Sequence, residues 1–146
     1  MEQKEKELLI IDLCGRLPYG VKAYIKNWSK IDRKYYEGTY TIESMYPSIN
    51  EIFATSDNGS VKVIVGYDDY EIKPYLFPMS SLNIFINKYK DEWDNILKLE
   101  IEDVSQDYIS TKGITANIEF FNKCHLDYRG LIEKGLAIDA TILNIY

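Results

Sequence analysis

The chain has few of the side chains that metal and redox sites use. Its 146 residues include one histidine, His125, and two cysteines, Cys14 and Cys124, which form no CxxC pair. Zinc sites need three or four Cys, His or carboxylate ligands at convergent spacings. We therefore expect no metal site and no cofactor, and we expect both cysteines to be reduced and to act as small apolar groups.

Motifs for common catalytic devices are also absent. The chain contains no GxGxxG, GxxxxGK[ST], GxSxG or HExxH pattern. The sequence therefore does not indicate a phosphate-binding loop, a nucleophile elbow or a zinc protease. This favours a non-catalytic protein and leaves an enzyme open.

Basic charge and long apolar runs are scarce as well. Lys and Arg number 17 against 23 Asp and Glu, a net charge of −6, which opposes a broad phosphate-binding surface. We therefore do not expect nucleic acid as a partner. No segment approaches 18 consecutive apolar residues, and the charged stretch Met1–Glu7 lacks the apolar core of a secretory signal. We expect a cytoplasmic protein without membrane association.

What is present suits one folded domain over residues 1–146, because 46% hydrophobic content can close a single core. The order of patterns predicts an α+β fold: an N-terminal helix, then a curled antiparallel sheet or small β-barrel of about four or five strands, then two to three C-terminal helices. Apolar residues at helical spacing predict the first helix over Gln3–Leu17, ended by a turn at Pro18–Gly20.

Alternating patterns between Val21 and Phe77 predict the strands. The segment Asn27–Lys34 has the composition of a polar hairpin loop between the first two strands. Asn58-Gly59 predicts a type I′ hairpin between the next two, because these residues adopt positive φ at low cost. A further short strand at Tyr70–Ile72 is expected to end before Pro74, which cannot donate a backbone hydrogen bond.

Helical spacing returns after Pro78. One helix is predicted over Leu82–Lys98 and another from Ser110 or Thr111 to Cys124-His125, while residues 99–109 fit an edge strand or a loop. Asp127 is placed to cap a short helix over Tyr128–Lys134. In the second of these helices, Ile114, Ile118 and Phe121 mark the buried face. Gly135 is expected to close the short helix, with Leu136 folding back on Leu131 or Ile132. The last segment, Ala140–Tyr146, is expected to form a terminal strand.

Cys14, Cys124 and His125 are the residues that an enzyme would have to use. Cys124-His125 and nearby Asp127 contain the parts of a Cys–His–Asp device. However, neighbouring residues on a helix point about 100° apart, so Cys124 and His125 cannot face one substrate atom unless the helix breaks between them. A structural His125 is the favoured interpretation.

Tyrosine is abundant, with 13 residues, and many of them stand near lysine. Amphipathic rings beside cations are typical of recognition surfaces, although a small curled sheet also uses tyrosine to cover its faces. The most basic stretch predicts a partner-binding segment. Its candidate residues are Lys30, Arg33, Lys34, Tyr35 and Tyr36.

Three blocks carry a resemblance: DLCGRLPYGVK at residues 12–22, DYEIKPYLFPMSS at 69–81 and HLDYRGLIEKGLA at 125–137. They resemble a family of short uncharacterised proteins from gut anaerobic bacteria and their phages and mobile elements. The family has no established activity, so the resemblance implies a setting and no catalytic residue. Polar residues that flank the turns of these blocks could converge on an anionic ligand. These are Arg16, Tyr19, Asp127, Tyr128 and Arg129.

Three functional hypotheses follow, in this order. The first is a non-catalytic binding module that holds a protein partner through a tyrosine-rich surface, plausibly in a phage or mobile element. The second is a protein that binds or sequesters a small nucleotide-like anion, with an arginine-floored pocket. The third is a Cys/His-dependent enzyme, which requires a thiol of lowered pKa beside the imidazole. The sequence makes no prediction of the oligomeric state.

Overall fold

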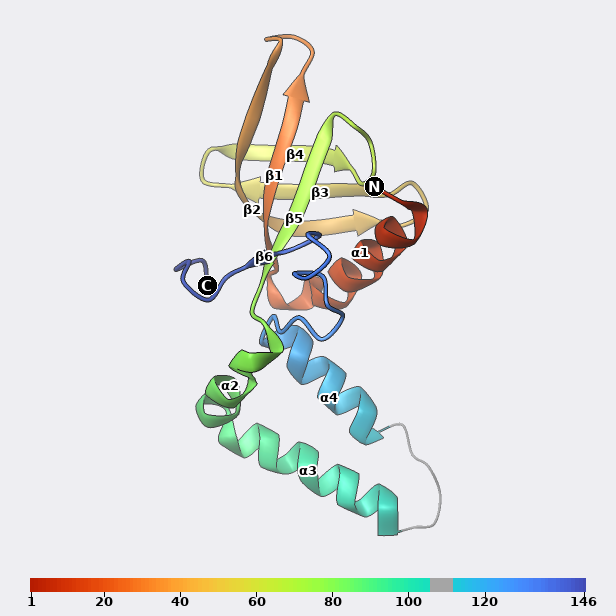
Figure 1. Cartoon of the computed structure of the whole chain (residues 1–146), viewed down its shortest axis with the longest axis vertical. Coiled ribbons are helices and arrows are strands. Elements are labelled where there is room, and N and C mark those ends of the chain that lie inside the picture. The colour runs from red at the N-terminus through yellow and green to blue at the C-terminus, as the bar shows by residue number, and fades with distance from the viewer. Residues whose placement is uncertain (106–111) are drawn as a thin grey trace.

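The computed structural model describes residues 1–105 and 112–146 (Figure 1). It shows an N-terminal helix, then a curled sheet, then three helices over residues 82–105 and 112–123, which we call the helical arm. The α+β class is therefore confirmed. The helices are α1 (Gln3–Arg16), α2 (Leu82–Lys88), α3 (Lys90–Ser105) and α4 (Lys112–Lys123), with short 3₁₀ turns at Leu17–Tyr19 and Met79–Ser81. The strands are β1 (Lys22–Ser29), β2 (Lys34–Tyr46), β3 (Glu51–Ser56), β4 (Gly59–Ile64), β5 (Tyr70–Leu76) and β6 (Ile138–Asp139).

Helix α1 forms almost where the periodicity predicts it. Glu2 and Glu5 make a reciprocal capping box at its start. Gly20 ends the following turn in the left-handed region at φ 66°, which glycine adopts at little cost. Leu9 and Leu13 are fully buried and share one core cluster with the inward residues of the strands.

The described strands make one open sheet in the order β4-β3-β2-β1-β5-β6. Of the two predicted forms, the small barrel is wrong, because β4 and β6 end the sheet without pairing to each other. The sheet is mixed and has six strands, where an antiparallel sheet of four or five was predicted, because β6 adds to β5 in parallel. The concave side is filled by α1 instead, whose apolar face packs on the strands. A register shift between Ile42 and Ser44 bends β2, so β3 and β4 cross the direction of β1 (Figure 1).

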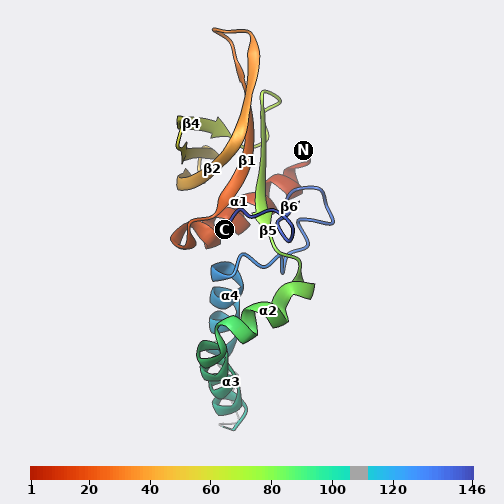
Figure 2. The same cartoon turned by 90° about the vertical axis from the view of Figure 1, so that its left-hand side faces the viewer.

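The β1–β2 hairpin is longer than predicted. β1 continues to Ser29, and only residues 30–33 form the turn, so Asn27, Trp28 and Ser29 belong to the strand and not to a loop. The T-shaped contact of Trp28 with Tyr35, 4.9 Å between ring centroids, joins the two strands there. Figure 2 shows this hairpin extending beyond the rest of the sheet, at the end opposite the helical arm.

The β3–β4 hairpin is present, but its turn differs from the prediction. Ser56 pairs with Gly59, so the two turn residues are Asp57 and Asn58. Gly59 has positive φ and Asn58 does not, which excludes a type I′ turn centred on Asn58-Gly59. The hydroxyl of Ser56 holds the turn, since it accepts from the Asn58 amide and donates to the Gly59 carbonyl, each at 3.3 Å.

Strand β5 passes through Pro74, contrary to the prediction that pairing ends before it. The amide of Ile42 donates to Val21 at 3.0 Å, and in antiparallel pairs such hydrogen-bonded positions alternate. Ala23, two residues on, therefore turns its polar groups toward Tyr40 on β2. Its pairing with Pro74 on the other side needs no hydrogen bond from the proline nitrogen.

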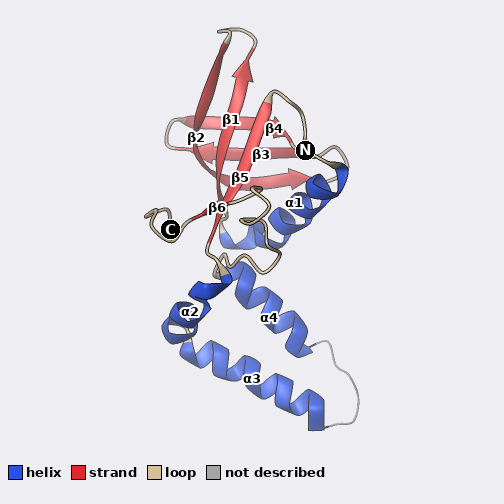
Figure 3. Ribbon diagram, viewed as in Figure 1, coloured by secondary structure: helices blue, strands red, loops and turns tan. Residues whose placement is uncertain are grey.

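The helical arm is broken where one helix was expected. α2 and α3 are separated at Tyr89, whose ψ is 45°. α3 continues to Ser105, so the part of segment 99–109 that is described is helical, and its remainder lies outside the described residues, as does the expected cap at Ser110 or Thr111. Figure 3 shows α3 and α4 side by side, extending away from the sheet.

The buried face of α4 is not the predicted one. Ile114 and Ile118 are 59% and 37% exposed, while Phe120 and Cys124 are buried. Aromatic packing selects this face, because the Phe120 ring lies 5.2 Å from Trp93 and 6.4 Å from Tyr89.

After α4, the chain makes turns where a short helix was predicted over 128–134, because Gly130 takes φ 69°. Gly135 is left-handed as expected, and Leu136 packs against Leu131. The terminal strand is the two-residue β6, parallel to β5, and not Ala140–Tyr146. Within the described residues, no helix is long and apolar enough to cross a membrane.

We expect Ile25→Ala to lower the free energy of unfolding by about 2–5 kcal/mol, because Ile25 is fully buried between the sheet and α1. Urea denaturation measures the loss. Ile31→Ala is the matched control, since Ile31 is 94% exposed at the hairpin tip and its truncation leaves the midpoint unchanged. Equal losses at the two positions would contradict this assignment of the core.

Candidate functional site

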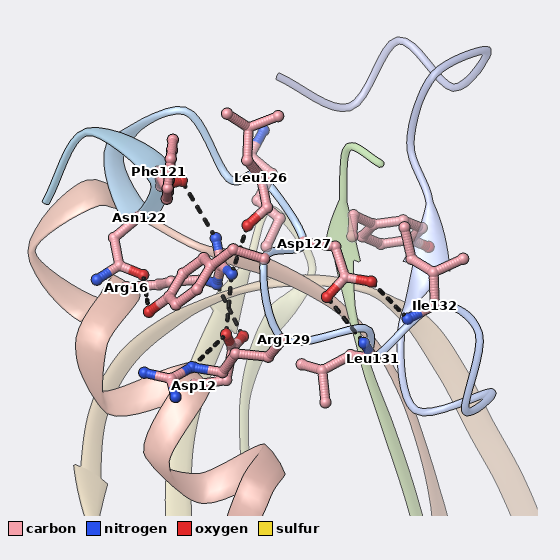
Figure 4. Close-up of polar contacts among 12 residues, drawn as sticks. Asp12, Arg16, Phe121, Asn122, Leu126, Asp127, Arg129, Leu131 and Ile132 are labelled. Carbon is pink, nitrogen blue, oxygen red and sulfur yellow. Dashed lines mark hydrogen bonds and ion pairs between the residues drawn. The ribbon is translucent and has the colours of Figure 1, made fainter. Parts of the chain in front are cut away.

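The first candidate site is a polar cluster at the junction of α1, the end of α4 and the segment that follows it (Figure 4). Asp12 and Arg16 lie one helical turn apart on α1, and both are fully buried. Arg16 donates from Nε to Asp12 Oδ2 at 2.7 Å and from Nη2 to Asp12 Oδ1 at 2.8 Å. This two-point ion pair compensates the burial of both charges.

Arg16 also reaches across the junction. Its Nη2 donates to the carbonyl of Leu126 at 2.8 Å, and its Nη1 makes a longer contact of 3.5 Å with the carbonyl of Phe121. These bonds join α1 to Phe121 near the end of α4 and to Leu126 just beyond it, and the two carbonyls also accept from the Leu126 and Tyr128 amides. The Arg16 guanidinium is thus engaged internally and does not floor an open pocket.

Arg129 and Tyr128 complete the cluster. Arg129 Nε lies 3.4 Å from Asp12 Oδ1, and its side chain is 26% exposed. The guanidinium carbons of Arg129 and Arg16 lie 4.7 and 5.6 Å from the centroid of the Tyr128 ring. The Tyr128 hydroxyl donates to Asn122 Oδ1 at 3.1 Å. The structure therefore brings Arg16, Tyr128 and Arg129 together around the Asp12 carboxylate, whereas the sequence analysis expected them around an anionic ligand.

Asp127 and Tyr19 have other contacts. The Asp127 carboxylate accepts from the amides of Leu131 and Ile132, both at 2.8 Å, so it caps the turn that follows it (Figure 4). Tyr19 is half-buried, and its backbone hydrogen-bonds the His125 imidazole. Both residues shape the chain around the cluster.

The two thiols lie in different apolar surroundings. Cys14 Sγ contacts the Met45 sulfur at 3.4 Å, whereas Cys124 packs with Ile96, Phe120 and Leu126. Burial raises the pKa of both thiols, that of Cys124 to about 11. A catalytic thiol requires the opposite direction, so neither cysteine has the electrostatic setting of a nucleophile.

His125 is buried and stacks on Tyr146, with 4.1 Å between ring centroids. Burial, and then the charge of Arg16, lower the pKa of His125 to about 4. The Tyr146 hydroxyl accepts from the Lys22 amide at 3.1 Å and donates to the Tyr75 carbonyl at 2.9 Å. The imidazole is therefore a neutral packing group that holds residues 140–146 against the sheet.

The second candidate site is the solvent-facing side of the β1–β2 hairpin. Ala23 and Ile25 point into the core, so Tyr24, Lys26 and Trp28 point outward by the period of two. They pair across with Thr39, Glu37 and Tyr35. We call five of these six outward residues the hairpin face, namely Tyr24, Lys26, Trp28, Tyr35 and Glu37.

Contacts hold the hairpin face in a defined arrangement. Lys26 Nζ lies 4.6 Å from the centroid of the Tyr35 ring, which meets Trp28 edge to face. Tyr24 donates its hydroxyl hydrogen to Glu37, and this bond, followed by burial, raises the pKa of Tyr24 to about 12. Tyr35 is 52% exposed. The face is thus an aromatic surface whose side chains are already ordered.

The predicted partner-binding residues are divided by the strand geometry. Tyr35 lies on the hairpin face, while Lys34 and Tyr36 point to the opposite side, where Lys34 Nζ lies 4.6 Å from the Tyr36 ring centroid. Lys30 and Arg33 are exposed in the turn. Sequence analysis missed Tyr24, Lys26 and Trp28. Their alternation with Ala23 and Ile25 was the available signal.

Among the residues that the structure describes, no three His, Cys, Asp or Glu side chains gather as metal ligands. The Asp12–Arg16 cluster has no such set, and the hairpin face has a single carboxylate. The Asp12–Arg16 cluster stabilises the fold internally, and the hairpin face offers aromatic contact area beside cations.

We expect Asp12→Asn to lower the free energy of unfolding by about 3–5 kcal/mol, because it leaves the buried Arg16 charge without its carboxylate. Arg129→Ala is expected to cost about 1 kcal/mol or less, since that ion pair is longer and partly exposed. Chemical denaturation of both variants measures the difference. Equal losses would show that Asp12 is not primarily the partner of Arg16.

His125 makes stability depend on pH. Its pKa is lowered from 6.5 to about 4 in the folded chain, so between these values the unfolded chain binds the proton more readily. The His125 contribution is therefore fully present above about pH 6.5 and is lost as the pH falls toward 4, by up to about 3 kcal/mol.

Denaturation midpoints of wild type and His125→Asn across this pH range test the assignment, because asparagine tolerates the left-handed φ of 54° at this position. The variant should lose less stability than wild type on acidification. Parallel pH profiles would contradict a buried neutral His125.

The chain was also compared with known proteins. No protein-family model, no curated protein and no solved structure matches it. The function is therefore inferred from the polar cluster around Asp12 and Arg16 and from the hairpin face.

Proposed function

We propose that the chain is a non-catalytic binding module that holds a protein partner through the hairpin face. The observation that carries this proposal is the ordered cluster of Trp28, Tyr35 and Lys26 on a hairpin that extends beyond the core (Figure 2). Trp and Tyr contribute much of the binding energy at protein interfaces, since they bury large areas with few rotatable bonds.

The contacts that hold the side chains of the hairpin face in place before a partner binds support the same proposal. Tyr24 is tied to Glu37, and Tyr35 is in contact with both Trp28 and Lys26, so a partner does not have to immobilise these side chains. Side-chain ordering is one of the main costs of association. The hairpin face is therefore suited to binding with little rearrangement.

The polar cluster supports a ligand site less well. Arg16 is fully buried, with hydrogen bonds to Asp12 and Leu126, which leaves Arg129 as the partly exposed arginine of that cluster. A nucleotide-like anion would need several converging donors. The phage or mobile-element setting implied by the sequence resemblance remains part of the proposal for the protein partner.

Photo-crosslinking tests the surface. A photoreactive phenylalanine analogue at position 35 is compared with the same analogue at position 46, because Tyr46 is similarly exposed, at 54%, near the far end of β2. We expect a specific crosslinked protein from position 35 and none from position 46 in a lysate of cells that express the chain.

The identified partner is then purified and titrated calorimetrically. Trp28→Ala should weaken binding about 30-fold, which is the effect of removing an interface anchor, and Tyr46→Ala should change it less than about twofold. Thermal unfolding checks that both variants are folded. Equal affinity of wild type and Trp28→Ala would refute the hairpin face as the binding surface.

A further inference from the structure

We infer that the open edge of β2, from Lys34 to Tyr40, binds an extended acidic segment of the protein partner by adding it to the sheet as a strand. This inference rests on the proposed function, because it names how the partner meets the hairpin. It uses a different part of the hairpin, namely the backbone and not the aromatic side chains.

The edge is open because β3 covers only half of β2. β3 pairs with β2 from Thr41 to Tyr46, and the chain then turns away at Ser56. Residues 34–40 pair with β1 on one side, and within the described residues no strand pairs with them on the other. A seven-residue edge without proline is a template for a further strand unless something covers it.

The hydrogen-bond alternation identifies the groups that face outward. Val21 and Ile42 form a hydrogen-bonded pair, so Tyr40, Gly38 and Tyr36 also point their polar groups toward β1. The residues between them, Tyr35, Glu37 and Thr39, direct their N–H and C=O groups away from β1.

Strand β1 gives an independent check on this alternation. Trp28 is the cross-strand partner of Tyr35, so its amide should point away from β2. It donates to the Asp69 carbonyl at 3.0 Å, on the β5 side. The outward direction of Tyr35, Glu37 and Thr39 is therefore consistent on both strands, and these three residues offer alternate donors and acceptors to an added strand.

Charge selects the chemistry of the segment. Residues 30–34 carry three cations and one anion in a chain whose net charge is −6. The anion, Asp32, accepts from the Tyr36 hydroxyl, and Glu37 accepts from the Tyr24 hydroxyl. Lys26 is not counted, because it lies on the hairpin face beside Asp68, Asp69 and Glu71. Lys30, Arg33 and Lys34 are exposed beside the open edge. An acidic strand complements this local charge, and a basic strand opposes it.

The probe is a fluorescent peptide of about eight residues, the length that spans the open edge, with valine and glutamate in alternation. A matched peptide carries lysine in place of glutamate. In an added strand, valines on one face contact Tyr35 and glutamates on the other lie beside Lys34. We expect the acidic peptide to bind at least about tenfold more tightly than the basic one in fluorescence anisotropy at up to about 1 mM protein.

The decisive variants are Thr39→Pro and Thr39→Ala. Both remove the same hydroxyl, but proline also removes an outward backbone donor that β1 does not use. Thr39→Ala should bind the acidic peptide within about twofold of wild type, whereas Thr39→Pro should bind it about tenfold more weakly. Circular dichroism and thermal unfolding check the fold of both. If Thr39→Pro fails to fold, peptide-induced protection of the Tyr35, Glu37 and Thr39 amides in wild type decides instead.

Several outcomes would overturn strand addition. These are equal binding of the two peptides, no binding, equal binding to both Thr39 variants, and protection at β4 in place of β2. Dimerisation through this edge, or preferential binding of an oligothymidylate, would assign the edge to a second copy or to nucleic acid. The proposed function is judged separately, because its readout is the effect of Trp28→Ala on the crosslinked partner.

Discussion

The ion pair of Asp12 and Arg16 holds the molecule together at the point where its parts meet. Two charges on one face of α1 are completely buried, which is tolerable only because each finds several partners. Arg16 also hydrogen-bonds the carbonyls of Phe121 and Leu126, which accept from the Leu126 and Tyr128 amides as well. Asp12 in turn faces Arg129. One buried pair thus connects α1, the end of α4 and residues 126–129.

The residues that stabilise this junction lie apart from the hairpin that carries the proposed binding surface. The arginine and the histidine that the sequence suggested for ligand binding or catalysis have internal partners. Arg16 forms the ion pair with Asp12, and His125 stacks on Tyr146. What remains unpaired within the described residues is the backbone edge of β2 from Lys34 to Tyr40, beside the exposed ring of Tyr35. The two proposals therefore concern one element, first through its side chains and then through its backbone.

Some local patterns predicted local structure. The periodicity of α1, the left-handed Gly135 and the capping role of Asp127 depend on neighbouring residues, and all three were visible in the sequence. Two local predictions were wrong, because the β3–β4 turn is not type I′ at Asn58-Gly59 and Asp127 caps turns in place of a short helix. Features that depend on distant pairing were not visible. Pro74 fits in β5 because Ala23 directs its backbone polar groups toward β2. The sheet stays open because α1 fills its concave side. α4 turns Phe120 inward because Tyr89 and Trp93 lie opposite. The hairpin face was missed for the same reason, since its residues come from two strands whose register only the folded sheet defines.

The most direct test of the hairpin as a ready binding edge is amide hydrogen exchange of the protein alone, resolved by residue with NMR. The structure predicts alternation along β2: slow exchange at Gly38 and Tyr40, whose amides bond to β1, and fast exchange at Glu37 and Thr39, whose amides face outward. Uniform protection of all four amides would contradict the account, because it would mean that the edge is already covered.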